Sequence, residues 1–221
     1  PTYILYPNRD TSMSLHETLQ HRRAIRYYDP EKPLDSARVE ECLRLATLAP
    51  TSSNMQLYRC DHITDPTVIA ALTSACLGQS TISTAKEVVI FAITPSRWRE
   101  RVDHLFPRIV EDIHKHQPEE KWAKYEAMQR EYMTKVVPFL YSRGCKVWGW
   151  ARHLVMNAIA LFRPIMRQGT EGDMKTVQHK SCALVAQTFM LAMSEAGYDT
   201  CPVEGFDARR VGTDTGLPSS V

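Results

Sequence analysis

The sequence is poor in glycine and has no glycine-rich phosphate loop. Only nine of its 221 residues are glycine, and neither G-x-G-x-x-G nor G-x-x-x-x-G-K-[ST] occurs. Both patterns hold nucleotide phosphates through backbone N–H groups at the start of a helix. The sequence therefore predicts neither a Rossmann dinucleotide site nor a P-loop, and a bound phosphate would have to be held by side chains.

Long apolar runs are also missing. The run 182–193 is too short to cross a membrane, and the run 147–162 is interrupted by Arg152, His153 and Asn157. A membrane-spanning helix needs about 20 mostly apolar residues. The N-terminal segment has no basic region followed by a long apolar stretch, so no secretory signal is predicted. We expect a protein of the cytoplasm with no membrane partner.

Neither an excess of charge nor a recognisable catalytic motif is present. The formal net charge is +2, which gives no reason to expect binding to nucleic acid. The six cysteines form no C-x-x-C pair and are predicted to be reduced thiols. G-x-S-x-G and HExxH do not occur, and His114 and His116 are two positions apart, so on a helix they point to different faces. No metal site is predicted.

Against this nearly balanced background, the stretch HRRAIRYYD (21–29) concentrates three arginines, Arg22, Arg23 and Arg26. The capping box at 14–17 predicts a helix that runs into these arginines and ends near residue 29. On such a helix Arg22 and Arg26 share a face, and paired guanidinium groups bind phosphate oxygens well. The alternative is that the arginines solvate the helix end or pair with nearby carboxylates, which are Glu17, Asp29 and Glu31.

Helix caps and apolar patterns predict an α+β class in one domain. Helices are expected after Asp35, ending before Pro50, and from Asp65-Pro66 to about Cys76. EVVIFAIT (87–94) is typical of a central strand buried on both faces. Further elements are predicted as a strand at 56–63, a helix at 174–196 ending at Gly197, a strand at 198–203 and a helix at 207–211.

A large helical insertion is predicted between the strand at 87–94 and the helix at 174–196. It covers about 95–172, and it contains all four tryptophans. Four prolines are expected to break it into separate helices, at positions 107, 118, 138 and 164.

Three segments, in this order along the chain, resemble a known family. They are HRRAIRYYDPEKPL (21–34), ECLRLATLAPTSSNMQLYR (41–59) and CPVEGF (201–206). The first is similar to an R-R-S-x-R-x-[FY] opening, the second to an A-P-S-S-x-N-x-Q-P-W loop and the third to a P-x-[EG]-G-[FY] turn. Together they resemble the FMN-dependent nitroreductase family over roughly 14–94 and 174–214.

The resemblance implies a three-layer α+β sandwich with a central mixed or antiparallel sheet, in a homodimer with FMN at the subunit interface. It implies that the arginines hold the FMN phosphate and ribityl chain. A loop of the partner subunit is implied to touch the flavin, through Pro50, Thr51, Ser52 and Asn54. A turn is implied to line the isoalloxazine ring, and Gln79 to make a further polar contact; the turn residues are Pro202, Val203, Glu204 and Gly205.

The implied activity is that of the flavin, with no catalytic side chain required. NAD(P)H would reduce the flavin, and a nitroaromatic, a quinone or a similar small-molecule acceptor would then be reduced in a ping-pong cycle. Other readings stay open within the fold: dehalogenation, flavin fragmentation, or a non-catalytic protein that binds flavin or a partner. The insertion could be a lid, a substrate cap, an arm around the second subunit or an interaction surface.

The sequence departs from the family pattern in three places. Ala24 stands at the usual serine, and Leu57-Tyr58 replaces Pro-Trp. The sequence stops at GLPSSV (216–221), where family members usually continue into a strand with a basic residue that helps to hold the phosphate. On this basis the three arginines are expected to carry more of the phosphate binding than usual.

Overall fold

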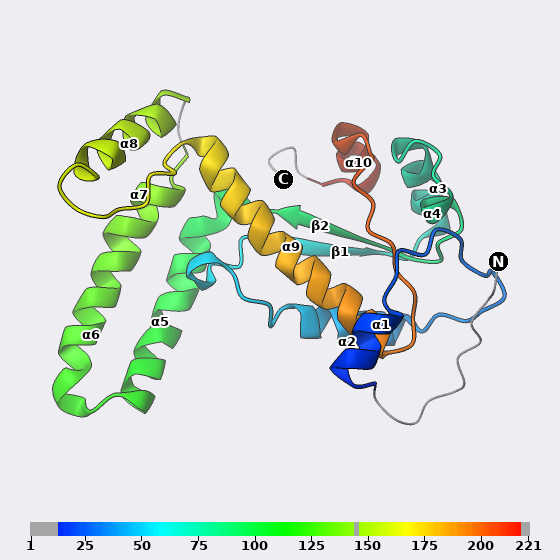
Figure 1. Ribbon diagram of the computed structural model, residues 1–221, viewed down its shortest axis with the longest axis horizontal. Coiled ribbons are helices and arrows are strands. Elements are labelled where there is room, and N and C mark those ends of the chain that lie inside the picture. The colour runs from blue at the N-terminus through cyan, green and yellow to red at the C-terminus, as the bar shows by residue number, and fades with distance from the viewer. Residues whose placement is uncertain (1–12, 144–145, 218–221) are drawn as a thin grey trace.

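The computed structural model describes residues 13–143 and 146–217, and the structural statements below refer to these residues (Figure 1). Helices dominate and the strands are few, so the class is α+β as expected. In chain order the elements are α1 (Leu15–His21), α2 (Ser36–Ala46), η1 (Ser52–Asn54), β1 (Tyr58–Ile63), α3 (Pro66–Ala75), α4 (Ser80–Ser83), β2 (Val88–Ile93), η2 (Pro95–Arg97), α5 (Trp98–His116), α6 (Glu119–Glu131), η3 (Tyr132–Val136), α7 (Val137–Tyr141), α8 (Lys146–Ile159), α9 (Glu171–Glu195) and α10 (Ala208–Thr215).

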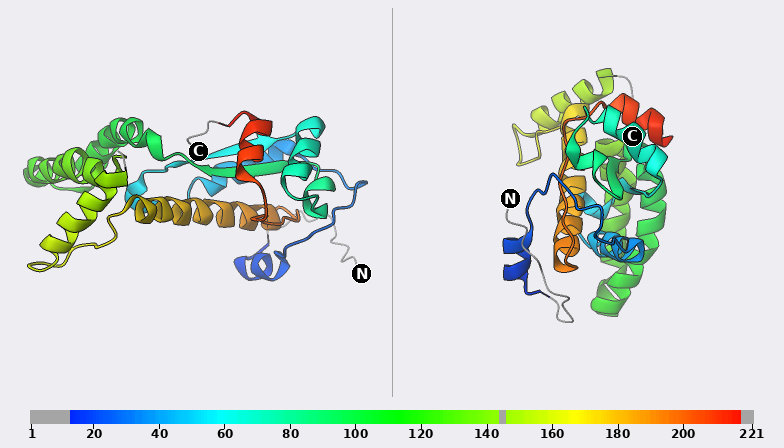
Figure 2. Two further views of the ribbon diagram at one scale, coloured as in Figure 1. Left: turned by 90° about the horizontal axis from the view of Figure 1, so that it is seen from above. Right: turned by 90° about the vertical axis from the view of Figure 1, so that its right-hand side faces the viewer.

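Two antiparallel strands form the middle of three layers. β1 pairs with β2 in a register that runs from Tyr58 opposite Ile93 to Ile63 opposite Val88. Alternate residues of a strand point to opposite faces. Phe91 and Ile93 therefore pack with α2 and α9, whereas Val88 and Ile90 pack with α3, α4 and α10. In Figure 2, α9 lies on one side of the strands and α10 on the other. β2 is packed on both faces as expected, but within the described residues it pairs with β1 alone, so the prediction of a central strand is wrong.

The predicted strand at 198–203 is wrong. This stretch contributes one isolated parallel bridge, between Ala24 and Thr200. Pro202 has no N–H with which to continue a ladder, so the pairing stops after one step. The bridge still matters, because it joins two segments that are far apart in the sequence.

α9 is the long helix against which the other layers pack. A capping box starts it: the Asp173 N–H donates to Thr170 Oγ1 over 3.1 Å, and the Thr170 N–H donates to the Asp173 carboxylate over 3.0 Å. Its core positions include Val185 and Phe189, which are 0% and 6% exposed. The helix ends before Gly197, whose φ of +85° is a conformation that glycine adopts without strain.

The first helix is shorter than predicted. The capping box at Ser14 and Glu17 is present, but α1 ends at His21, and Arg22 is already extended with ψ of 117°. The Ile25 N–H donates to the Thr200 carbonyl over 3.2 Å instead of to the preceding turn. The tertiary bridge thus replaces helical hydrogen bonds that the local pattern favours. The prediction that the arginines share a helical face is wrong.

Helices α5 to α8 (98–159) project from the three layers, and we call them the helical arm (Figure 1). The arm has its own core, which includes Trp98, Leu105, Met133 and Val137. Two residues that precede β1 and one residue of α9 complete this core: Met55, Leu57 and Met174. The loop before β1 is therefore packed into the arm.

Three of the four prolines lie at helix boundaries of the arm, and one does not. Pro118 precedes α6, Pro138 lies in the first turn of α7, and Pro164 follows α8. Pro107 is inside α5, so the predicted break there is wrong. A proline within a helix costs about 3 kcal/mol. The helix continues because Leu105 and Ile113, on either side of Pro107, are both buried.

Arg152 is the most buried charged residue described, at 1% exposure. Its guanidinium donates to four backbone carbonyls, those of Gly169 at 2.5 Å, Phe139 at 3.0 Å, Leu140 at 2.7 Å and Ser142 at 3.3 Å. It thereby joins α8 to the end of α7 and to the segment before α9. Within the described ranges, no helix has both the length and the apolar character needed to cross a membrane.

Candidate functional site

Two of the three segments that resemble the family pattern lie side by side. The bridge between Ala24 and Thr200 places the arginine segment (22–26) next to the turn at 201–206. His21 adds a second anchor, because its Nδ1 lies 2.8 Å from the Ser194 hydroxyl near the end of α9. Segments separated by about 175 positions therefore meet at one end of α9.

No carboxylate pairs with the three arginines in the described part of the chain. Arg23 donates to the carbonyls of Leu19 and Arg22, over 3.2 and 2.7 Å, and its side chain is exposed. Arg26 is exposed and Arg22 is half-buried. The alternative that nearby carboxylates occupy these guanidinium groups is therefore not realised. Their charge is available to an anion.

Hydrogen bonds hold the turn at 201–206 in place, and three of its backbone N–H groups have no acceptor in the described residues. The Gln79 side chain donates to the carbonyls of Gly205 and Cys76, over 2.7 and 2.9 Å. Asp207 donates its N–H to the Ala75 carbonyl and caps α10 with its side chain. In the residues that the structure covers, the N–H groups of Val203, Glu204 and Gly205 have no hydrogen-bond acceptor. Gln79 therefore supports the turn, and the free N–H groups can donate to a ligand.

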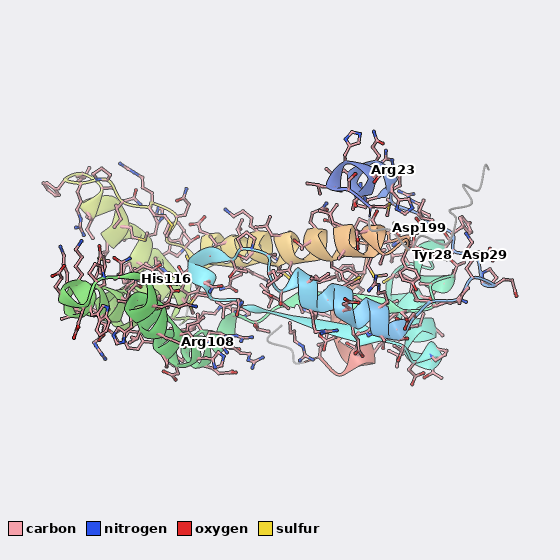
Figure 3. All side chains as sticks on the ribbon, turned by 90° about the horizontal axis from the view of Figure 1, so that it is seen from below. Arg23, Tyr28, Asp29, Arg108, His116 and Asp199 are labelled. Carbon is pink, nitrogen blue, oxygen red and sulfur yellow. The ribbon has the colours of Figure 1, made fainter. Side chains whose placement is uncertain are left out.

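Tyr28 stands at the last position of the R-R-S-x-R-x-[FY] pattern and borders this region, although no role was predicted for it. Burial raises the pKa of its phenol well above the ordinary value of 10.0, and Asp199 and Cys201 raise it further. The phenol is therefore neutral and keeps its proton at physiological pH. In Figure 3, Arg23, Tyr28 and Asp199 lie at one end of the molecule, whereas Arg108 and His116 lie in the arm.

The loop that carries Pro50, Thr51, Ser52 and Asn54 lies elsewhere. The Ser52 N–H donates to the Ser181 hydroxyl over 3.1 Å, in the first half of α9. The arm supplies two more contacts: the Tyr141 hydroxyl donates to Ser52 Oγ over 3.1 Å, and the hydroxyls of Ser53 and Tyr132 are 2.6 Å apart. Sequence patterns did not reveal these partners, because a tyrosine in a helix carries no signal for a distant serine.

The two groups of residues are anchored at different points along α9. One group is anchored at Ser194 and the other at Ser181, on the same straight helix. At 1.5 Å per residue these anchors are about 20 Å apart. Pro50 to Asn54 and the arginine segment therefore belong to two different surfaces of one chain.

The described residues hold no group of three or more His, Cys, Asp and Glu side chains that could bind a metal ion. His114 lies 2.5 Å from the Glu126 carboxylate and stacks on Trp122 with ring centroids 4.1 Å apart. His116 lies 3.0 Å from the Asp112 carboxylate. His114 therefore links α5 to α6, and His116 links two turns of α5, at the surface of the arm.

Comparison with known sequences identifies a family model and a curated relative that match this chain. The sequence model of the Nitroreductase family matches residues 19–221. A curated relative, Protein DrgA of Synechocystis sp., is 21% identical over 207 residues, which are 94% of this chain and 79% of that protein.

Solved structures show the same fold. A protein of Staphylococcus epidermidis described as an NAD(P)H:FMN oxidoreductase is similar with a TM-score of 0.65 at 20% identity, over 95% of this chain and 82% of that one. A protein of Exiguobacterium sibiricum described as a nitroreductase, solved in complex with FMN, has a TM-score of 0.62 at 22% identity, over 96% and 84% of the two chains. The family match spans nearly the whole sequence and includes all three segments, and the chain belongs to the nitroreductase family.

Proposed function

We propose that this protein is an FMN-dependent oxidoreductase that uses NAD(P)H to reduce a nitroaromatic, a quinone or a similar acceptor. The observation that carries the proposal is the pairing of the arginine segment with the 201–206 turn through the Ala24–Thr200 bridge. The pairing combines unpaired positive charge with unpaired backbone donors at one end of α9. Family membership and the FMN complex of the Exiguobacterium sibiricum protein support the choice of cofactor.

The residues present fit the phosphate of FMN. A phosphate needs donors whose charge is not already neutralised, and no described carboxylate pairs with Arg22, Arg23 or Arg26. Guanidinium groups bind phosphate through two parallel, charge-assisted hydrogen bonds. Because the segment is extended rather than helical, its side chains do not share a single face. Binding therefore orders arginines that are free to reorient. Arg22 and Arg26 are the members whose side chains make no hydrogen bond in the described chain.

The turn fits the ring system of the cofactor. Val203, Glu204 and Gly205 offer N–H groups that can donate to ring heteroatoms, and Gln79 keeps their backbone in place through the Gly205 carbonyl. When bound, the flavin supplies the transfer of hydride and electrons. The chain's own task is to orient the ring and to stabilise negative charge on it with preorganised donors.

We propose that the loop at 50–54 completes the site of a second copy of the chain. The anchors of the two groups lie about 20 Å apart along α9, and each group is therefore assigned to a different cofactor. A homodimer brings the loop of one copy to the arginines of the other.

The arm and the segments that follow α2 and α8 also expose apolar side chains that a second copy could cover. Leu48 is 79% exposed just before the loop, and α8 and the segment after it expose Trp150 at 64%, Leu154 at 66% and Phe162 at 88%. Large exposed apolar areas mark protein interfaces. We propose that the arm embraces the partner subunit.

Flavin titration tests the proposed function. The purified protein is mixed with FMN, and the quenching of flavin fluorescence gives a dissociation constant. Excess NADH or NADPH is then added without oxygen, and a nitroaromatic or a quinone follows. The proposal expects saturable binding, loss of the flavin absorption band with one of the two donors and its return with the acceptor. A protein that binds no FMN, or whose bound FMN neither donor reduces, contradicts it.

A further inference from the structure

The loop at 51–56 has an unusual backbone. Ser53, Asn54 and Gln56 have φ values of +54°, +52° and +48°, although none of them is glycine. In this left-handed region the Cβ atom crowds the backbone, so a run of such residues is unfavourable by itself. Conformations of this kind persist only where the surrounding structure holds them, and they concentrate at functional sites.

Hydrogen bonds inside the loop do not account for its shape. The Asn54 and Met55 N–H groups donate to the carbonyls of Thr51 and Ser52, and the Gln56 N–H donates to Thr51 Oγ1 over 3.1 Å. These bonds close short turns. They do not fix where the loop lies relative to the rest of the chain.

The bond from the Ser52 N–H to Ser181 of α9 is one such fixation, and the arm adds two more through tyrosine hydroxyls. Tyr141 is 3% exposed, and its hydroxyl donates to Ser52 Oγ over 3.1 Å. The hydroxyl of Tyr132, which is half-buried, lies 2.6 Å from Ser53 Oγ. Both bonds end on consecutive residues at the start of the left-handed stretch.

Both tyrosines pack with the arm's core. Met55 and Leu57, which follow the loop, are 1% and 4% exposed and share the arm's core with Tyr141. Tyr132 begins η3, a π-helical segment in which the Val137 N–H donates to the Tyr132 carbonyl. A π-helical turn changes the direction of side chains relative to an α-helix and is frequent at functional sites.

We propose that Tyr132 and Tyr141 are positioning residues through which the helical arm holds the loop for the cofactor. This inference rests on the proposed function, in which the loop contacts FMN. The arm then sets flavin affinity without touching the flavin, and a change in the arm is transmitted to the site through two hydroxyl groups.

Conservative variants separate this role from simple packing. Tyr132→Phe and Tyr141→Phe keep each ring and remove only the hydroxyl. Tyr125→Phe is the matched control, because Tyr125 is a half-buried tyrosine of α6 whose hydroxyl has no hydrogen-bond partner in the described residues. Three quantities are measured for each variant: the FMN dissociation constant, the thermal midpoint, and hydrogen exchange of the loop amides of residues 52–56 in the protein without FMN.

A lost neutral hydrogen bond is expected to weaken FMN binding roughly 2- to 10-fold in each variant, and to speed exchange of the loop amides by a similar factor. Tyr125→Phe is expected to change neither. Adding Ser53→Ala to Tyr132→Phe should add little, because both changes remove the same bond.

Loop exchange equal to that of wild type in both tyrosine variants overturns the proposal, and this result does not depend on FMN. Faster exchange with unchanged FMN affinity also overturns it, because the loop is then held for another purpose. If wild type itself binds no FMN, the proposed function fails, and the exchange data still decide whether the tyrosines hold the loop.

Discussion

The two groups of candidate cofactor residues are built in opposite ways. The arginine segment is attached by one bridge and one histidine contact, and the side chains of Arg22 and Arg26 make no hydrogen bond in the described chain. In the loop at 51–56, side chains and backbone are tied to α9 and to the arm, and the backbone is held in a left-handed conformation.

The two groups would contribute to binding an anionic ligand in different ways. Mobile guanidinium groups attract a phosphate by charge and order around it, at the expense of side-chain entropy. A preformed loop has already lost that entropy during folding, so it contributes shape and hydrogen-bond direction. We therefore expect variants of the arginines to change affinity strongly and leave folding intact, whereas variants of the arm change folding first.

The largest effect is expected for Arg22→Ala combined with Arg26→Ala. Charge-assisted hydrogen bonds contribute about 1.5–3 kcal/mol each, so the double variant should bind FMN about 100-fold more weakly or worse. Flavin fluorescence titration measures this, and the thermal midpoint should stay near that of wild type. Arg44→Ala combined with Arg108→Ala is the control, because both arginines are exposed and have no described ion pair. Equal affinity of the double variant and wild type would show that the phosphate is held elsewhere.

Arg152→Met tests the expectation that variants of the arm affect folding first. Burial lowers the pKa of Arg152, yet the guanidinium is held by four carbonyls that would lose their donor. Buried polar groups without a partner cost about 1–3 kcal/mol each, and we expect a loss of roughly 3 kcal/mol in the free energy of unfolding. Arg163→Met, at an exposed site, should stay within about 0.5 kcal/mol.

Hydrogen exchange in Arg152→Met shows which region of the chain loses stability. The loop amides of residues 52–56 should exchange faster, because the loop packs on the arm. The Ile25 amide, which is bonded to the Thr200 carbonyl, should exchange at the wild-type rate, because in the described residues its segment does not contact the arm. If exchange became faster to the same extent in the loop and at Ile25 under native conditions, the two regions would not be stabilised independently.

The smallest effect is expected at the caps. Thr170→Ala removes the capping box of α9 and should cost about 1 kcal/mol in urea unfolding. Ser14→Ala removes the box of the seven-residue α1 and should cost less, because that helix is short and peripheral. The Thr170 hydrogen bonds hold the pKa of Asp173 below its ordinary value of 3.8. This contribution is therefore full above pH 3.8 and is lost as the pH falls through the lower folded value. A larger loss of unfolding free energy for Ser14→Ala than for Thr170→Ala would contradict this ranking of the two capping boxes.

Elements with strong local signals were predictable from the sequence. Asp35, Asp65-Pro66 and Gly197 mark helix ends through capping and backbone preferences that act within a few residues. EVVIFAIT gave β2 because an apolar β-branched run has few alternatives. The α+β class followed from helix caps and apolar patterns, and the family followed from three short segments; the family match confirms the family.

Features decided by distant partners were not predictable. α1 ends early because Ile25 finds the Thr200 carbonyl, and Pro107 stays helical because its neighbours are buried. In the sequence, Arg152 was interpreted only as an interruption of an apolar run. In the fold, its guanidinium donates hydrogen bonds to carbonyls of two other segments. The roles assigned to the cofactor residues remain predictions.

A complementation experiment tests the central proposal, that each flavin site is shared between two copies, most directly. One chain carries Arg22→Ala and Arg26→Ala, and the other carries Ser52→Ala and Asn54→Gly, where glycine tolerates the φ of +52°. Each variant alone should bind FMN poorly. Purified as a mixed dimer with two affinity tags, they should regain one site of wild-type affinity per two chains, because arginines of one copy then meet the loop of the other. A mixed dimer that binds no better than either variant would contradict the account.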